Sequence, residues 1–132
     1  MVTLHLLQLL ADNNFGVIDK TLFWEKLPID GHGVAIYSRG GPMPARGKMI
    51  LSIDFYSRGS NDLLGADKLE KIHQFFENHM FICDLPEISG KSVKKYRKVH
   101  ITPESNIENL GQDETDRLIF RSSYQIKYIK ES

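Results

Sequence analysis

Five histidines and one cysteine are the residues of this 132-residue chain best suited to ligate a metal or to act as base and nucleophile. The histidines, at positions 5, 32, 73, 79 and 100, form no His-x-x-x-His or His-Glu-x-x-His pattern, and Cys83 lacks a Cys-x-x-Cys partner. Asp30 and His32 could ligate a metal together within their turn, but we favour a glycine-rich polar turn. We therefore predict no metal site.

Motifs for nucleophilic catalysis and phosphate binding are also missing from the sequence. There is no Gly-x-Ser-x-Gly elbow, and Cys83 sits in an apolar run rather than an electropositive pocket. Gly40-Gly41-Pro42 is no phosphate loop, because proline lacks an N–H donor and no Gly-Lys-Ser/Thr follows. The acidic run 113–116 lacks the alternation and glycine of a calcium loop, which favours a solvated turn. We predict no catalytic residue, no cofactor and no enzyme activity.

The placement of charge says more than its sum, which is zero from 17 basic and 17 acidic residues. Five basic residues and no acid lie in the basic run Lys91–Lys98. Five acidic residues and no base lie in the acidic run Glu104–Asp116. Two solvated loops would explain these runs. The alternative is a pair of complementary patches that join copies of the chain head to tail, a geometry that closes into rings.

Hydrophobic periodicity predicts the elements that position these residues. Leu4–Leu10 is a short amphipathic helix stopped by Asn13-Asn14 and Gly16, too short for a membrane span and without the flanks of a secretory signal. A second helix, capped by Asn61 or Asp62, ends near residue 78. Strands are expected at 21–28, 34–39, 48–58, 80–85, 98–102 and 117–130, with a Gly/Pro-rich loop at 40–47.

The strand at 48–58 has the clearest alternation, with one buried and one wetter face. Met49, Leu51, Ile53 and Phe55 mark the buried face, and the wetter face holds Lys48, Ser52, Asp54, Tyr56 and Arg58. The motif Tyr-Ser-Arg-Gly ends two predicted strands, at 37–40 and 56–59. Pairing of the two strands would not by itself bring Arg39 and Arg58 together. We therefore favour coincidence, in which both copies contain residues that suit the end of a strand, over a shared functional role.

Together these elements predict an α+β fold: one domain over residues 1–132, a mostly antiparallel or mixed sheet of about five strands, and two helices packed on one face. The composition, 41% hydrophobic and 26% charged, suits a globular domain. A single cysteine excludes a disulfide within the chain and suits a reducing cytosol.

The order of these elements resembles the tail terminator family of long-tailed bacteriophages, also described as minor capsid or tail-completion proteins. The segments that carry the resemblance are a strand ending in Gly-Gly-Pro (34–42), an alternating strand ending in Arg-Gly (51–59), the helix 62–78 and the final strand 116–126. The resemblance covers nearly the whole chain.

The resemblance implies a structural virion protein, assembled in the host cytoplasm, that forms a homohexameric ring at the head-proximal end of the tail tube. Such a ring terminates tube polymerisation, contacts the major tail tube protein and a head-completion protein, and lets genomic DNA pass through its lumen without sequence-specific binding; no membrane partner is implied. Stretches 89–98 and 104–116 are the candidates for loops that order on assembly. The interface candidates are Arg39, Arg58, Lys94, Lys95, Arg97, Lys98, Asp113, Glu114 and Asp116.

A small nucleic-acid-binding module is the alternative function. It would use the basic run Lys91–Lys98 to neutralise phosphates and Tyr96 to stack on a base.

Overall fold

The computed structural model of the chain describes residues 2–26, 33–45, 47–58, 64–78, 82–86, 88, 96–112 and 118–129. These residues form two helices and seven strands of an α+β domain. In chain order the elements are α1 (Val2–Asp12), β1 (Leu22–Trp24), β2 (Gly33–Ala45), β3 (Lys48–Arg58), α2 (Leu64–Asn78), β4 (Ile82–Cys83), β5 (Val99–Pro103), β6 (Glu108–Gln112) and β7 (Leu118–Ile129).

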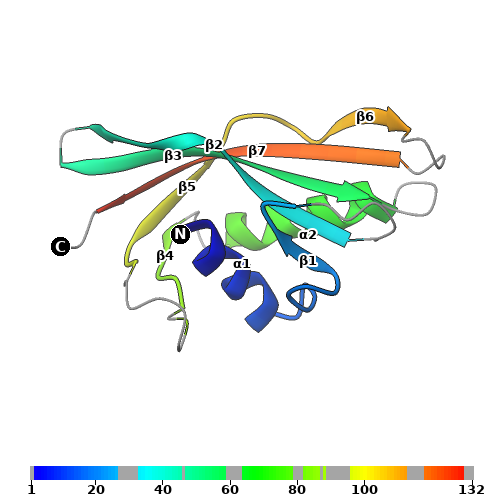
Figure 1. Ribbon diagram of the computed structural model, residues 1–132, viewed down its shortest axis with the longest axis horizontal. Coiled ribbons are helices and arrows are strands. Elements are labelled where there is room, and N and C mark those ends of the chain that lie inside the picture. Colours follow the sequence, from blue (N-terminus) through cyan, green and yellow to red (C-terminus); the bar gives the residue numbers. More distant parts are fainter. Residues whose placement is uncertain are drawn as a thin grey trace.

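The seven described strands belong to one mixed sheet, in which six follow the order β1-β2-β3-β7-β5-β4 and β6 pairs with β7. β1 runs parallel to β2, and the other pairings are antiparallel. The last strand of the chain is therefore central: β3 pairs along one edge of β7, and β5 and β6 share its other edge. Both helices cover one face of the sheet, while the segment between β5 and β6 arcs over the opposite face (Figure 1).

The core lies between the helices and the sheet because apolar residues alternate along the central strands. Ile53 of β3 faces Tyr124 of β7, and Phe55 and Ile126 extend the same buried layer. From α2, Leu69, Ile72 and Phe76 repeat at three- and four-residue steps and are buried against it. The predicted α+β fold with both helices on one face is confirmed, with more strands than the five expected.

Two stretches predicted as loops are strands. β2 continues through the Gly/Pro-rich residues 40–45 and pairs with the start of β3, after a register shift between Arg39 and Met43. Proline is tolerated there because β1 pairs only with Val34–Ile36, which leaves this half of β2 at the sheet edge. β6 lies within the stretch 104–116, and its residues lack clear alternation, so only the available edge of β7 makes them a strand.

Gly33 lets β1 and β2 approach each other, and this contact yields a prediction for stability. Gly33 has φ +152°, and a Cβ atom there would lie 2.3 Å from the backbone oxygen of Thr21. Gly33→Ala should lower the free energy of unfolding by about 2 kcal/mol, since both backbone strain and a backbone clash oppose it. Urea denaturation measures the effect.

Gly41→Ala is the matched control, because a Cβ atom at Gly41 meets no atom within 4 Å. An equal loss of stability in the two variants would contradict the close approach of β1 to β2.

Tyr124, at the centre of the core, yields a pH prediction. Its hydroxyl lies 3.1 Å from Nδ1 of His73, and burial raises the pKa of Tyr124 to about 12. Because the unfolded tyrosine titrates near 10, the folded state holds this proton more tightly, so stability is full below pH 10 and falls between pH 10 and 12. The contribution lost is about 2 to 3 kcal/mol.

Urea denaturation of the wild type and of Tyr124→Phe at pH 9 and at pH 12 tests this. The variant should lose less stability over this interval, because it no longer has the Tyr124 hydroxyl to titrate. The raised pKa values of Tyr96 and Tyr128 contribute the same loss in both proteins. The same alkaline loss in both proteins would show that Tyr124 does not contribute.

Candidate functional site

The face of the sheet opposite the helices is here called the open face. It carries the alternate side chains of the strands, those that do not point into the core. The pairing register places Tyr37 beside Asp54, and Asp54 beside Ser123. The next row along the strands joins Tyr56 of β3 to Arg121 of β7 and to Glu108 of β6. Polar and aromatic residues from four strands thus meet on one surface.

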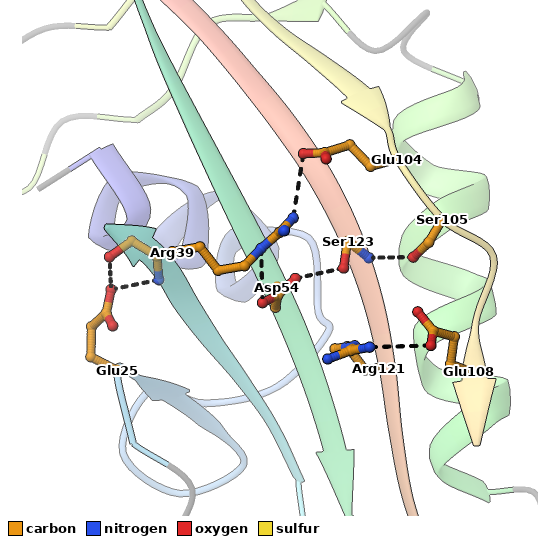
Figure 2. Close-up of polar contacts among 9 residues, drawn as sticks. Glu25, Arg39, Asp54, Glu104, Ser105, Glu108, Arg121 and Ser123 are labelled. Carbon is orange, nitrogen blue, oxygen red and sulfur yellow. Dashed lines mark hydrogen bonds and ion pairs between the residues drawn. The ribbon is translucent and has the colours of Figure 1, made fainter. Parts of the chain in front are cut away.

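Asp54 is the centre of the polar contacts on the open face, and its side chain is only 6% exposed although no helix covers it. Its Oδ2 atom lies 3.1 Å from Nε of Arg39, and its Oδ1 atom accepts a hydrogen bond of 2.5 Å from Oγ of Ser123 (Figure 2). A buried carboxylate is tolerated only when it is paired and hydrogen-bonded, and both conditions hold here.

The segment between β5 and β6 is tied to this centre by side-chain contacts. Glu104 pairs with the guanidinium of Arg39 at 3.4 Å, and Ser105 Oγ accepts a hydrogen bond from the backbone N–H of Ser123. Arg121 pairs with Glu108 at 3.1 Å, and hydrogen bonds to Tyr56 and Glu108 raise the pKa of Arg121 (Figure 2). A small polar hollow of about 250 Å³ lies among these residues.

A larger pocket of about 560 Å³ adjoins it on the open face. It is lined by Tyr37 and Arg39 from β2, by Asp54, Tyr56 and Arg58 from β3, and by Leu110 and Ile119. The rings of Tyr37 and Tyr56 meet edge to face, with centroids 5.3 Å apart. We call this the Tyr-Arg pocket.

The Tyr-Arg pocket brings the two Tyr-Ser-Arg motifs together, contrary to our expectation that their arginines need not meet. β2 and β3 are antiparallel neighbours, and in both motifs the tyrosine and the arginine fall on the open face. The serine between them points to the helices in both copies, because side chains alternate along a strand. Both arginines therefore line one pocket.

Two further interface candidates, Arg97 and Lys98, do not line this pocket. Arg97 and Lys98 are exposed, and the backbone N–H of Lys98 donates to Asp84. Lys94, Lys95, Asp113, Glu114 and Asp116 lie outside the described residues, as do Asp30 and His32.

One prediction about the charged runs is wrong, and the structure adds contacts for the other run. Tyr96 is only 7% exposed and contacts the rings of His5 and Tyr128, so it is not available to stack on a nucleic-acid base. In the acidic run, Glu104 and Glu108 remain partly exposed and pair with arginines of the same chain. The reason is the arc of this segment over the open face, where β2 and β7 present Arg39 and Arg121.

The contacts of the open face hold side chains in place. Ser123 is buried, and the carboxylate beside it is already paired with Arg39, so neither group is placed to attack a substrate. His5 is buried against the carbonyl oxygen of Pro86, and the half-buried His73 lies against the hydroxyl of Tyr124. Within the described ranges, no group of three or more histidine, cysteine or acidic residues is arranged to hold a metal ion.

Most lining residues of the pocket were absent from the predicted site. The alternation of β3 had already placed Asp54 and Tyr56 on its wetter face, but nothing in the sequence placed Leu110 or Ile119 beside them. The repeated Tyr-Ser-Arg motif was the signal that could have found the pocket.

No protein-family model matches the chain, and no curated protein matches its sequence. Neither of the two helices that the structure describes is long and apolar enough to cross a membrane.

Asp54 yields a prediction for the stability of the open face. Asp54→Asn removes the negative charge that holds Arg39 and should lower the free energy of unfolding by about 2 kcal/mol. The control is Asp67→Asn. The Asp67 carboxylate pairs with Lys71 on the exposed side of α2, and its loss should change stability by at most about 0.5 kcal/mol.

Urea denaturation of Asp54→Asn, Arg39→Gln and the double variant completes the test. The double variant should lose less than the sum of the single losses, since each single change breaks the same contact. Strictly additive losses would mean that the Arg39–Asp54 pair contributes nothing.

Proposed function

We propose that the chain is a structural assembly protein that forms a homohexameric ring at the head-proximal end of a bacteriophage tail tube. In this role it ends polymerisation of the tube and provides the surface on which the head is joined. It is assembled in the host cytoplasm and becomes part of the virion tail. Genomic DNA passes through the ring without sequence-specific binding.

The observation that carries the proposal is the order of elements along the chain. A helix, a strand with Gly-Gly-Pro, an alternating strand, a second helix and a long final strand follow each other as the resemblance to tail terminators requires. With both helices on one side, the open face offers a partner arginines, tyrosines and aliphatic side chains. Such a mixed surface suits contact with proteins.

The charged runs support ring formation in part. Arg97 and Lys98 of the basic run are exposed, whereas two glutamates of the acidic run are paired within the chain. The remaining members of the complementary patches are therefore Asp113, Glu114 and Asp116 on the acidic side.

The nucleic-acid alternative has less support, because it loses Tyr96 as its stacking residue. It still predicts an affinity that falls steeply with salt, in proportion to the phosphates neutralised. Filter binding at low and moderate salt separates the two functions, since the assembly protein should not retain DNA even at low salt.

Tail-tube capping tests the assembly function directly. Tubes polymerised from a major tail tube protein encoded beside this chain should become shorter when the chain is added, with a ring at one end in electron micrographs. Light scattering reports the arrest of polymerisation in the same samples. If the folded protein neither caps tubes nor forms rings, the assembly function is wrong.

Charge reversal tests the patches separately from the function. Changing Lys94, Lys95 and Arg97 to Glu should leave the monomer folded and impair ring assembly, and changing Asp113, Glu114 and Asp116 to Lys in the same chain should partly restore it. Three changes are needed because an exposed pair contributes at most about 1 kcal/mol. Normal assembly of the first triple variant would contradict the patches and leave the assembly function standing.

A further inference from the structure

We propose that the end of the open face where β7 finishes docks the connection between β6 and β7 of a second copy of the chain. The docking surface, here called the apolar-lysine patch, consists of Met43, Lys48, Ile50, Lys127 and Ile129. The inference rests on the proposed function in placing this contact between neighbours of the ring. The contact itself needs no tail tube and is tested without one.

Two neighbouring rows of the open face form the apolar-lysine patch. The register places Met43 of β2 beside Ile50 of β3, and Ile50 beside Lys127 of β7. The next row joins Lys48 of β3 to Ile129 of β7. Residues paired across antiparallel strands point to the same face, so the five side chains share one surface. This surface and β6 lie at opposite ends of the sheet (Figure 1).

Exposed apolar side chains mark the patch as a contact surface. Met43 is 70% exposed and Ile129 is 56% exposed, the two highest values among the large hydrophobic residues that the structure describes. The half-buried Ile50 lies on the strand between them. A partner that covers these side chains removes apolar surface from water, which is favourable.

The charge of the patch selects an acidic partner. Lys48 and Lys127 form no ion pair with any residue in the described part of the chain, and the two rows that hold them contain no acidic residue. Arg39 and Arg121, in contrast, are already paired with glutamates. A carboxylate brought to either lysine therefore displaces no existing partner.

The chain itself carries an acidic and apolar segment, at the connection between β6 and β7. Leu110 of β6 is 44% exposed. Three acidic residues, Asp113, Glu114 and Asp116, follow it within the next six positions of the sequence. The segment thus provides carboxylates for the two lysines and an aliphatic side chain for the exposed apolar residues of the patch.

The patch and the connection cannot meet within one chain, because they lie at opposite ends of β7. The connection leads into Leu118, the first residue of β7, whereas Ile129, the last residue, belongs to the patch. At about 3.3 Å per residue, the 12 residues of the strand separate its ends by about 35 Å. A second copy can bring its connection to the patch head to tail, which leaves its own patch free for a third copy.

The exposed part of the basic run lies at the same end of the sheet as the patch. Arg97 and Lys98 lead directly into β5, where His100 pairs with Lys127. Positive charge therefore gathers where β7 ends, and the acidic run finishes where β7 begins. Contact between two copies of the patch would place lysines against lysines, which disfavours a symmetric dimer.

Sedimentation velocity of the full chain, at micromolar to millimolar concentrations and without tail tubes, tests the contact. The wild type should form species larger than a dimer, and high salt should weaken them. The double variant Lys48→Glu, Lys127→Glu should associate at least about tenfold more weakly. The matched control, Lys20→Glu with Lys71→Glu, makes the same change of charge at exposed lysines outside the patch and should associate like the wild type.

The apolar part of the patch is tested in the same way. Met43→Ser with Ile129→Ser should weaken association about tenfold, because less apolar surface is buried in the contact. Val17→Ser is the control, since Val17 is 55% exposed and lies outside the patch. Urea denaturation checks that every variant is folded.

A mixing experiment identifies the two surfaces as partners. The triple variant Asp113→Lys, Glu114→Lys, Asp116→Lys should not associate alone. A one-to-one mixture with the double variant Lys48→Glu, Lys127→Glu should regain species larger than a dimer, because the reversed connection of one protein faces the reversed patch of the other. A symmetric contact between patches would give only dimers in this mixture.

Four results would overturn the proposal: a wild type that stays monomeric at millimolar concentration, patch variants that associate like the wild type, a mixture that regains no association, or a mixture that stops at dimers. Binding of a thymidine oligonucleotide or of anionic lipid vesicles through the patch, without self-association, would also overturn it. Tube capping is measured separately. A chain that caps tubes but does not associate through this patch loses the contact and keeps the proposed function.

Discussion

The antiparallel pairing of β3 with β7 is the constraint on which both faces of this domain depend. All residues of β3, from Lys48 to Arg58, have a partner on β7 in a continuous register. Because side chains alternate along each strand, this single register defines two layers at once. Ile53 and Tyr124 enter the core beneath the helices, while Asp54 and Ser123, one residue along, meet on the open face. A shift by one residue would bury the charges and expose the core.

The open face needs this register because a buried carboxylate lies on it. Asp54 is stable there only with Arg39 on one side and Ser123 on the other, and those residues come from the two strands that flank β3. The same contacts hold Arg39 at the wall of the Tyr-Arg pocket. One set of side chains thus stabilises the open face and orders the wall of the pocket.

Some of the charges of this chain are paired with each other on the open face. Arg39, Asp54 and Glu104 form one group of contacts, and Arg121 and Glu108 form another, all within the open face. Two acidic residues of the run Glu104–Asp116 are therefore already paired within one chain. Fewer charged residues remain for contacts between copies. Within the two charged runs, the proposed assembly patches are therefore restricted to residues 91–98 and 113–116.

Hydrophobic periodicity was enough to predict the α+β class, α1, the end of α2 and the bounds of β3, because the period along one segment reports its buried face. It also separated the faces of β3, with Asp54 and Tyr56 on the wetter one. Tertiary structure alone decided which strands are neighbours, since pairing between distant segments leaves no local pattern. Strand pairing made residues 40–45 and 108–112 strands, and tertiary packing buried Tyr96. The two Tyr-Ser-Arg motifs meet in one pocket because antiparallel neighbours present their open-face residues to the same side.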